Sequence, residues 1–188
     1  MSFSNALQRH FDTFNQLDKI AADSQLLADQ IQQCFDQGGK LIFMGNGGSA
    51  ADSQHLAAEF VVRYKAERRP LAAIALTVDT SILTAHSNDY SYDSVFTRQV
   101  QALAKPEDLI IGISTSGNSA NVIDAIEAAK EIGCTSWAWT GSHGGKLNDI
   151  ADHLIRVPSD ETARIQEAHI FVGHWLCEEM DRRTTSNA

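Results

Sequence analysis

Residues 40–50 read KLIFMGNGGSA and pass from an apolar run, through glycines, into a helical stretch. The run Lys40–Met44 is almost wholly apolar, which is typical of a strand that is buried on both faces. The helical stretch behind it covers Ser49–Tyr64. A buried strand that leads directly into a helix is the repeating unit of a parallel α/β sheet. This stretch therefore predicts the fold class.

The same alternation recurs along the chain. Further short apolar runs lie at Leu71–Thr77, Asp108–Ser114, Thr135–Thr140 and His153–Pro158. Helical patterns cover the first 38 residues, which close on Gln37-Gly38-Gly39, then Ser119–Ile132 and a final stretch over residues 161–183. We predict an α/β fold with a doubly wound parallel five-stranded sheet flanked by helices. No repeat or linker divides the chain, so we expect one domain over residues 1–188, with a helical extension over residues 1–38 and a C-terminal helix.

Composition excludes several classes of protein. The chain has 188 residues, 24 Asp and Glu against 15 Lys and Arg, and a net charge of −9. It has no basic run that would neutralise a row of phosphates and no apolar stretch of about 18 residues, so we expect neither nucleic acid nor membrane as a partner. The start of the chain lacks the layout of a secretory signal. The three cysteines form no CxxC pair. We expect free, buried thiols and a cytoplasmic location.

Two loops at predicted strand ends have the composition of ligand-binding loops. The first, over Phe43–Ser49, contains three glycines and an Asn, so its backbone can approach a ligand closely in front of a helix N-terminus. The second, over Ile113–Ser119, offers hydroxyls, a Gly and an Asn before another helix. Neither matches a P-loop or a full GxGxxG fingerprint. Together they predict a cradle for a small monophosphate, the alternative being ordinary turns with Ser or Thr caps.

Ionisable side chains gather on two predicted helices. His55 and Glu59 are four residues apart and share one helix face. They suit a divalent metal or a base with its orienting partner, the alternative being an ordinary solvated helix face. On the last helix Gln166 and His174 are separated by about 12 Å along the axis. His169 is the competing partner of Gln166, and spacing leaves this choice open. Asn88-Asp89 is either a turn or part of the sheet's ligand-binding edge.

Four segments in a fixed order carry a resemblance to a known family. They are GNGGSAADSQHLAAE (residues 45–59), LTVDTSILTAHSND (76–89), GISTSGNSANV (112–122) and ARIQEAHIFVGH (163–174). They resemble the phosphoheptose isomerases, within the sugar isomerase (SIS) family. The resemblance implies a homotetramer with active sites at subunit interfaces. It also implies a phosphorylated sugar substrate, with conversion of D-sedoheptulose 7-phosphate to D-glycero-D-manno-heptose 7-phosphate at the start of nucleotide-activated heptose synthesis, which supplies the lipopolysaccharide core.

The resemblance also assigns roles to residues. The family's zinc (Zn²⁺) ligands match His55, Glu59, Gln166 and His174, so the resemblance favours His174 over His169. Its proposed base and acid match Glu59 and His174. Its substrate contacts match Asn46, Gly47, Gly48, Glu59, Asn88, Asp89, Ser114, Thr115, Ser116, Ser119 and Gln166. One position departs from the pattern, because Ala163 stands where the family often has Asp.

An aldose–ketose isomerase must move a proton between C1 and C2. Under this hypothesis Glu59 abstracts the proton to give a cis-enediol and His174 reprotonates it, while a zinc ion polarises the carbonyl. Two other classes of protein compete with this reading. One is the related SIS tetramer that binds the replication initiator, which lacks the Glu and the final His that are present here. The other is an SIS module that senses a phosphosugar without turning it over.

Overall fold

The computed structural model describes residues 2–185 and contains one parallel sheet. The five strands lie in the order β2-β1-β3-β4-β5, and every neighbouring pair is parallel. Their bounds are β1 Leu41–Gly45, β2 Ala73–Ala75, β3 Leu109–Ile113, β4 Thr135–Thr140 and β5 His153–Arg156. The predicted doubly wound five-stranded sheet is confirmed. Strand β2 departs most from the prediction, because only Ala73–Ala75 of the run Leu71–Thr77 pair with β1.

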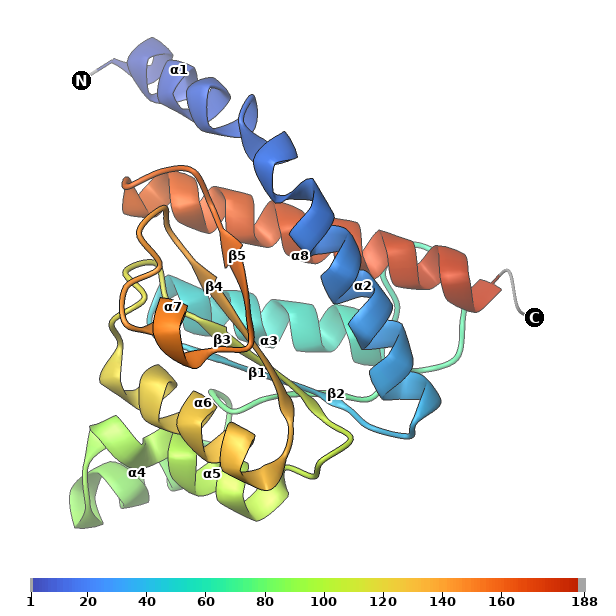
Figure 1. Cartoon of the computed structure of the whole chain (residues 1–188), viewed down its shortest axis with the longest axis vertical. Helices are drawn as coiled ribbons and strands as arrows, with labels where there is room; N and C mark the ends of the chain where they lie inside the picture. Colours follow the sequence, from blue (N-terminus) through green and yellow to red (C-terminus); the bar gives the residue numbers. More distant parts are fainter. Residues whose placement is uncertain (1, 186–188) are drawn as a thin grey trace.

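Helices cover both faces of the sheet (Figure 1). One layer contains α2 (Ala21–Asp36), α3 (Gly48–Val61) and α8 (Thr162–Thr185), and the other contains α5 (Val95–Leu103) and α6 (Ala120–Ile132). The remaining elements are α1 (Phe3–Phe14), η1 (Leu17–Ile20), α4 (Thr80–Asp89), η2 (Tyr92–Ser94) and α7 (Leu147–Ile150). Helix α5 was not predicted. The sequence favours a short helical turn over residues 80–86, and α4 extends this turn to Asp89.

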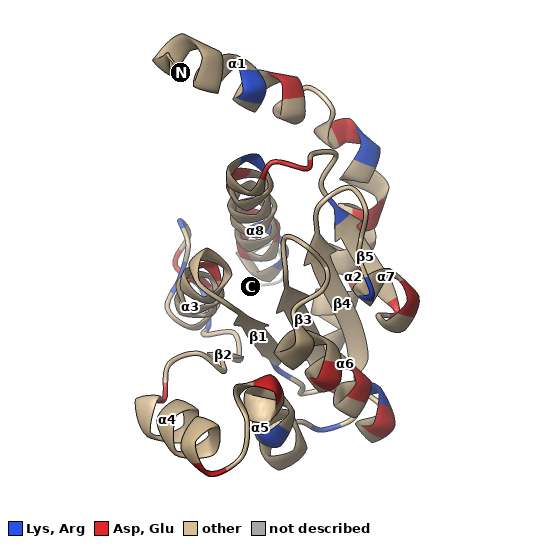
Figure 2. Cartoon of the chain, turned by 90° about the vertical axis from the view of Figure 1, so that its left-hand side faces the viewer, with Lys and Arg blue, Asp and Glu red and all other residues tan. Residues whose placement is uncertain are grey.

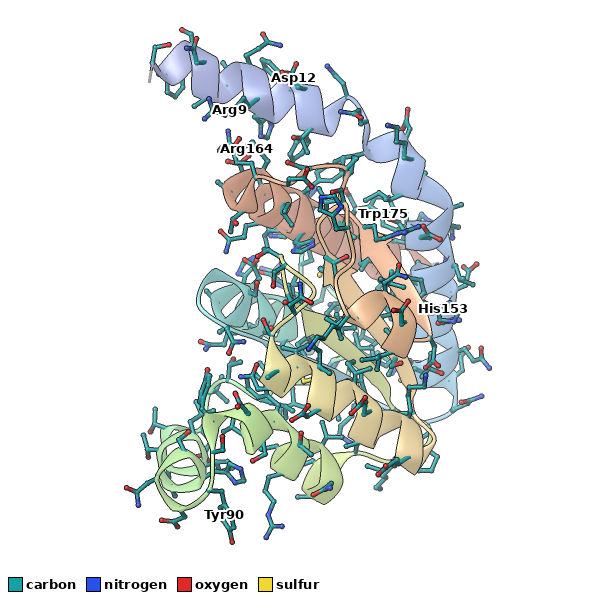
Figure 3. All side chains as sticks on the ribbon, turned by 60° about the vertical axis from the view of Figure 1, so that its left-hand side comes forward. Arg9, Asp12, Tyr90, His153, Arg164 and Trp175 are labelled. Atoms are coloured by element: carbon teal, nitrogen blue, oxygen red, sulfur yellow. The ribbon has the colours of Figure 1, made fainter. Side chains whose placement is uncertain are left out.

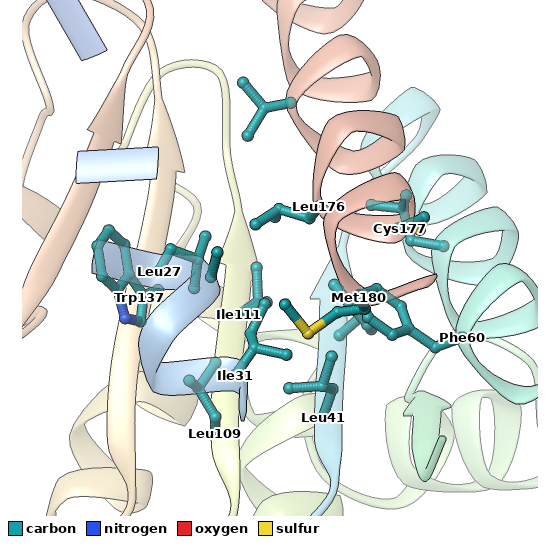
Figure 4. Packing of buried hydrophobic residues seen from close by; sticks show 14 of the residues in the cluster. Leu27, Ile31, Leu41, Phe60, Leu109, Ile111, Trp137, Leu176, Cys177 and Met180 are labelled. Carbon is teal, nitrogen blue, oxygen red and sulfur yellow. The ribbon is translucent and has the colours of Figure 1, made fainter. Parts of the chain in front are cut away.

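The core forms on both sides of the sheet because successive strand residues point to opposite faces. Leu41 and Phe43 pack with α2, α3 and α8, whereas Ile42 and Met44 pack with α5 and α6. Figure 4 shows the first of these layers, with helix residues closing over the strands; the labelled residues are Leu27, Ile31, Leu41, Phe60, Leu109, Ile111, Trp137, Leu176, Cys177 and Met180. The uninterrupted apolar runs of the sequence follow from this two-sided burial.

Helices α3 and α8 lie side by side and run in the same direction. Gly48 lies against Gln166, Leu56 lies against Gly173 and His55 lies against His174, so positions advance together along both helices. A Cβ atom on Gly173 would lie 2.4 Å from Leu56 Cδ2, so glycine allows the close approach. Figure 2 views both helices nearly end-on. In this view basic and acidic residues are interspersed along the chain and form no basic stripe.

Helix α1 extends away from the sheet and is attached by polar contacts to α8 and to Glu161, the residue that precedes α8. Arg9 Nε lies 2.8 Å from Glu161 Oε2, His10 Nδ1 lies 2.8 Å from Glu167 Oε2, and Arg164 donates to the Ala6 carbonyl at 2.7 Å. In Figure 3, Arg9 and Arg164 lie in the space between the two helices. Phe3, Leu7 and Phe11 stay exposed on α1.

Two expectations about the chain can be compared with the structure. Cys34, Cys134 and Cys177 are free and buried, as predicted, and burial raises the pKa of Cys34 to about 12 and that of Cys134 to about 11. Within residues 2–185, no helix combines the length and the apolar character needed to cross a membrane.

Candidate active site

The glycine loop (Phe43–Ser49) leads from β1 into α3 and is shaped by close contacts. Gly47 has a φ of 56°, a conformation that favours glycine. A Cβ atom on Gly45 would lie 2.9 Å from the Ile113 carbonyl oxygen, so the ends of β1 and β3 meet closely. A Cβ atom on Gly48 would lie 2.5 Å from Gln166 Nε2. The absence of a side chain at Gly48 therefore leaves room for the Gln166 amide over the first turn of α3.

The hydroxyl loop (Ile113–Ser119) leads from β3 into α6. The Ser114 and Ser119 hydroxyl oxygens lie 2.8 Å apart and hydrogen-bond to each other. Ser119 is the N-cap residue of α6 but makes no side-chain cap hydrogen bond. The alternative of an ordinary Ser cap therefore does not hold for this helix. Its N-terminal N–H groups remain suited to an anion such as a phosphate.

A pocket of about 280 Å³ opens beside the hydroxyl loop. Thr115 and Ser116 contribute to its wall, and the residues of the facing loops include His143 and Asp160. His143 Nε2 lies 3.3 Å from Asp160 Oδ1, and the Ser142 hydroxyl donates to the same carboxylate. The pocket thus combines hydroxyl groups with a carboxylate, a lining that suits a polyhydroxylated ligand.

An amide pair joins the two loops. Asn46 Nδ2 donates to Asn121 Oδ1 at 2.9 Å, and Asn121 Nδ2 donates back to Asn46 Oδ1 at 2.9 Å. Asn121 belongs to α6 and is 3% exposed. The Tyr92 hydroxyl of η2 also donates to Asn46 Oδ1, at 2.8 Å. Asn46 is therefore held by two segments that are far from it in the sequence.

An imidazole pair joins α3 and α8. His55 Nε2 lies 2.9 Å from His174 Nε2, and Glu59 Oε1 lies 3.8 Å from His55 Nε2. Burial lowers the pKa of His174, and the neighbouring His55 adds to this effect against the attraction of Glu59. The Tyr64 ring stacks on His174, with centroids 5.5 Å apart and planes 24° apart. The imidazole of His174 is thus held from two sides and favours its neutral form.

The predicted zinc ligands come together only in part. His55, Glu59 and His174 form one group, whereas Gln166 lies at Gly48, about two helical turns earlier on α8. Two nitrogens bound to one tetrahedral zinc lie about 3.3 Å apart, slightly more than the imidazole pair here, so a small movement would admit the ion. Within residues 2–185, no three His, Cys, Asp or Glu side chains already surround a metal position. The nitrogen and oxygen donors fit zinc in their chemistry.

The structure separates His169 and the Asn88-Asp89 pair from this group. His169 is fully buried and its Nε2 hydrogen-bonds to the Thr140 carbonyl oxygen at 3.2 Å. Asn88 and Asp89 end α4 and are exposed, with Asn88 Nδ2 donating to Asp89 Oδ1 at 2.8 Å. Within this chain neither Asn88 nor Asp89 contacts His55 or His174.

Sequence reasoning missed several residues of the site. They are Tyr64, which stacks on His174, and Tyr92 and Asn121, which hydrogen-bond to Asn46. Each contact joins segments that are distant in the sequence, so no periodic pattern reveals it. Asp52 could have been found, because it shares a helix face with His55 and Glu59. Its Oδ2 is buried without a hydrogen-bond partner, and burial raises the pKa of this carboxyl while His55 opposes the rise.

Comparison with known proteins gives concordant results. The family model described as the SIS domain matches residues 2–141. The probable phosphoheptose isomerase of Thermoplasma acidophilum is 56% identical over 157 residues, which is 84% of this chain and 86% of that protein. The phosphoheptose isomerase of Akkermansia muciniphila is 51% identical over 171 residues, 91% and 90% of the two chains. The solved structure of a phosphoheptose isomerase from Neisseria gonorrhoeae superposes with a TM-score of 0.89 at 43% identity, covering 95% of this chain and 96% of that one.

Proposed function

Because the chain belongs to the phosphoheptose isomerases of the SIS domain family, we propose that it converts D-sedoheptulose 7-phosphate to D-glycero-D-manno-heptose 7-phosphate, the first step of nucleotide-activated heptose synthesis. One observation carries the mechanism. Glu59 Oε1 and His174 Nε2 both lie within 4 Å of His55 Nε2, at 3.8 and 2.9 Å. A carboxylate and an imidazole from two helices therefore lie close to the same atom, which supports their use as the two proton-transfer groups of an isomerase.

Glu59 is the proposed base. Its carboxylate removes a proton from C1 of the ketose while His174, the proposed acid, gives its N–H proton to the C2 carbonyl oxygen, which leaves a cis-enediol. C2 then takes the proton back from Glu59 while O1 loses its proton to His174, so the aldose forms and both side chains return to their starting state. The neutral imidazole of His174 has one N–H to give, in keeping with the lowered pKa. Each positioned proton-transfer group contributes a rate factor of about 10²–10⁴.

The two loops are the proposed holding site for the substrate. Ser114, Thr115, Ser116 and Ser119 would receive the phosphate at the N-terminus of α6, where the helix dipole favours an anion. Asn46, Gly47, Gly48 and Gln166 would contact the sugar at the first turn of α3, since Gln166 lies against Gly48. A site of hydroxyls and main-chain N–H groups holds a phosphate without a lysine, which agrees with the acidic composition of the chain.

We also propose a zinc ion held by His55, Glu59, His174 and Gln166. When bound, zinc would polarise the carbonyl oxygen of the sugar as a Lewis acid. Because a ligated carboxylate is a weaker base, the ion would either leave Glu59 during turnover or serve mainly to organise the site. The imidazole pair and Glu59 support the zinc site, because their donors gather within 4 Å of His55 Nε2. Gln166 would have to lean along α8 toward them. Metal analysis of the purified protein tests the proposal, and we expect about one zinc per chain and its loss in a His55→Gln variant.

A homotetramer is the proposed assembly, with Asn88 and Asp89 reaching the site of another copy. Apolar side chains support it: Phe3 is 82% exposed and Phe171 is 50% exposed. Between η1, α2 and α8 a groove of about 420 Å³ carries further apolar residues, among them Phe14, Leu17 and Trp175. Light scattering of the eluted protein measures the assembly.

We propose a cytoplasmic location, because the proposed substrate is a water-soluble phosphosugar and the three cysteine thiols are free and buried.

The decisive experiment incubates the purified protein with sedoheptulose 7-phosphate, with and without chelator, and follows the sugar by NMR. We expect an aldoheptose 7-phosphate to appear. A Glu59→Gln variant should lose several orders of magnitude in turnover while it still binds the ketose. Glu67→Gln is the matched control, since Glu67 is an exposed carboxylate on the loop after α3. A folded, metal-loaded wild-type protein that leaves the ketose unchanged would refute the isomerase and favour a phosphosugar-sensing module.

A further inference from the structure

Three segments of the chain meet at the amide of Asn46. Asn46 belongs to the glycine loop after β1, Asn121 lies in the first turn of α6, and Tyr92 is the first residue of η2. The 3-10 turn is itself fixed, because the Ser91 hydroxyl accepts from the Asp93 N–H at 3.1 Å and η2 packs against α6. The Tyr92 hydroxyl therefore approaches Asn46 from a supported position.

The hydrogen bonds of Asn46 leave one group free. A side-chain amide has an oxygen with two lone pairs and a nitrogen with two N–H groups. Asn46 Oδ1 accepts from Asn121 Nδ2 at 2.9 Å and from the Tyr92 hydroxyl at 2.8 Å, so both lone pairs are used. One N–H is donated to Asn121 Oδ1 at 2.9 Å. The second N–H is the hydrogen-bonding capacity that remains.

The two partners of Asn46 differ in what they supply. Asn121 is buried and fixes the plane of the Asn46 amide through two reciprocal hydrogen bonds. Tyr92 is about half exposed and adds only its hydroxyl. With Tyr92 in place the oxygen of Asn46 is saturated, so a ligand cannot donate to it. The hydroxyl thus restricts Asn46 to the role of a donor.

We infer that Tyr92 is a positioning residue for substrate binding, which holds Asn46 so that its remaining N–H donates to an acceptor oxygen of the phosphosugar. This inference rests on the proposed function, in which Asn46 contacts the substrate. Without the Tyr92 hydroxyl, Asn46 Oδ1 regains an open lone pair and its amide loses one of three hydrogen bonds. Losing such a neutral hydrogen bond corresponds to a change in substrate affinity of about 3- to 10-fold.

The chain offers a matched control for Tyr92. Tyr90 lies two residues earlier, is 71% exposed and stacks on His86, with ring centroids 5.0 Å apart. Figure 3 shows Tyr90 at the outer edge of the α4 region, away from the sheet. Tyr92→Phe and Tyr90→Phe each remove one hydroxyl and keep the ring. Only the first removes a hydrogen bond to Asn46.

The first measurement reads the amide directly and needs no turnover. In ¹⁵N-correlated NMR spectra, the Asn46 side-chain NH₂ signals are assigned by their absence in an Asn46→Ala variant. We expect Tyr92→Phe to shift them and Tyr90→Phe to leave them in place. Unchanged signals in Tyr92→Phe would overturn the inference whatever the enzyme's activity.

The second measurement is a double-mutant cycle in the steady-state kinetics with sedoheptulose 7-phosphate. We expect Tyr92→Phe to raise KM about 3- to 10-fold with little change in kcat or in the unfolding temperature. In the Asn46→Ala background the same change should have no further effect. Losses that multiply, or equal KM values for the two Tyr→Phe variants, would refute the inference. If the wild type binds the ketose without turning it over, the proposed function fails, and affinities measured by calorimetry then replace KM in the same double-mutant cycle. If the wild type does not bind the ketose, the proposed function and the inference are both refuted.

Discussion

Arg68 and Asp181 form a buried ion pair, with Nε and Oδ1 2.7 Å apart and side-chain exposures of 0% and 6%. Arg68 also donates to the carbonyl oxygens of Phe60 and Glu59, both at 2.9 Å. The second oxygen of Asp181 accepts from the N–H groups of Lys65 and Ala66, both at 2.8 Å. The pair therefore anchors the end of α3, which carries Glu59, against α8, which carries His174.

Removal of one partner of this pair should destabilise the protein strongly. Burial by itself raises the pKa of Asp181, but hydrogen bonds from Ala66, Lys65 and Arg68 outweigh it and hold the pKa below its usual value. In Arg68→Met the carboxylate stays buried without its partner, so we expect a loss of about 3–5 kcal/mol in the free energy of unfolding. Urea denaturation measures it.

The control for this prediction is the exposed pair of Arg63 and Glu67. Its closest atoms are 3.8 Å apart, and the side chains are 51% and 91% exposed. Arg63→Met should cost less than about 1 kcal/mol. Equal losses in the two variants would show that burial does not set the contribution of the Arg68–Asp181 pair.

The stacked ring of Tyr64 should set the orientation of His174. Tyr64→Leu removes the aromatic face, whereas Tyr64→Phe keeps it. Because an aromatic pair contributes about 0.5–1.5 kcal/mol beyond area burial, we expect kcat to fall about 3- to 10-fold in the Leu variant only. The ¹H signal of His174 Cε1–H, which the ring current of Tyr64 shifts, should move in Tyr64→Leu and stay in Tyr64→Phe. A kcat that falls equally in both variants would point to the hydroxyl instead.

The buried His169 should make stability depend on pH. Burial lowers its pKa from 6.5 to about 4, and the hydrogen bond to Thr140 only partly opposes this. Between these values the unfolded chain binds more protons than the folded one, so stability falls as pH drops from 6.5 toward 4. The largest slope for one such group is about 1.4 kcal/mol per pH unit.

A variant pair tests this origin of the pH dependence. Chemical denaturation at several pH values should give a weaker slope for His169→Gln than for the wild type. His143→Gln, at an exposed histidine, should keep the wild-type slope. If His169→Gln retains the full slope, carboxylates rather than His169 dominate this range.

Gly48→Ala should impair the site without unfolding the chain. The new Cβ would lie 2.5 Å from Gln166 Nε2, the far end of a flexible side chain, which can move aside. We expect at least about a tenfold loss of kcat/KM, since Gln166 leaves its position, and an unfolding temperature close to that of the wild type. Ala51→Ser, on an exposed position of the same helix, is the control. Full activity in Gly48→Ala would show that the position of Gln166 is immaterial.

The sequence predicted those features that repeat along the chain. Strand β4 has the predicted bounds, Thr135–Thr140. It lies between β3 and β5, and together these two strands pair with every residue of the run. The short apolar pattern of α5 was missed, since Val95, Phe96 and Val100 are buried without the length of a longer amphipathic helix. Local periodicity therefore predicted the strands and the long helices but failed on the short helix α5.

The site divides in the same way. His55 and Glu59 could be paired from the sequence, because a spacing of four puts them on one helix face. Their contact with His174 depends on how α8 lies against α3, and the meeting of Tyr92 with Asn46 depends on where η2 packs. Such contacts between distant segments leave no periodic signal in a single sequence.

The parallel course of α3 and α8 limits how the length of this chain can vary. Gly48 and His55 are seven residues apart, and their partners Gln166 and His174 are eight apart, so the rise along the two helices differs by only about 1.5 Å over this interval. One residue inserted between either pair of positions would rotate everything beyond it by about 100° and advance it by about 1.5 Å. Insertions in evolving relatives are thus admissible in the surface loops, whereas these two intervals must keep a constant residue count.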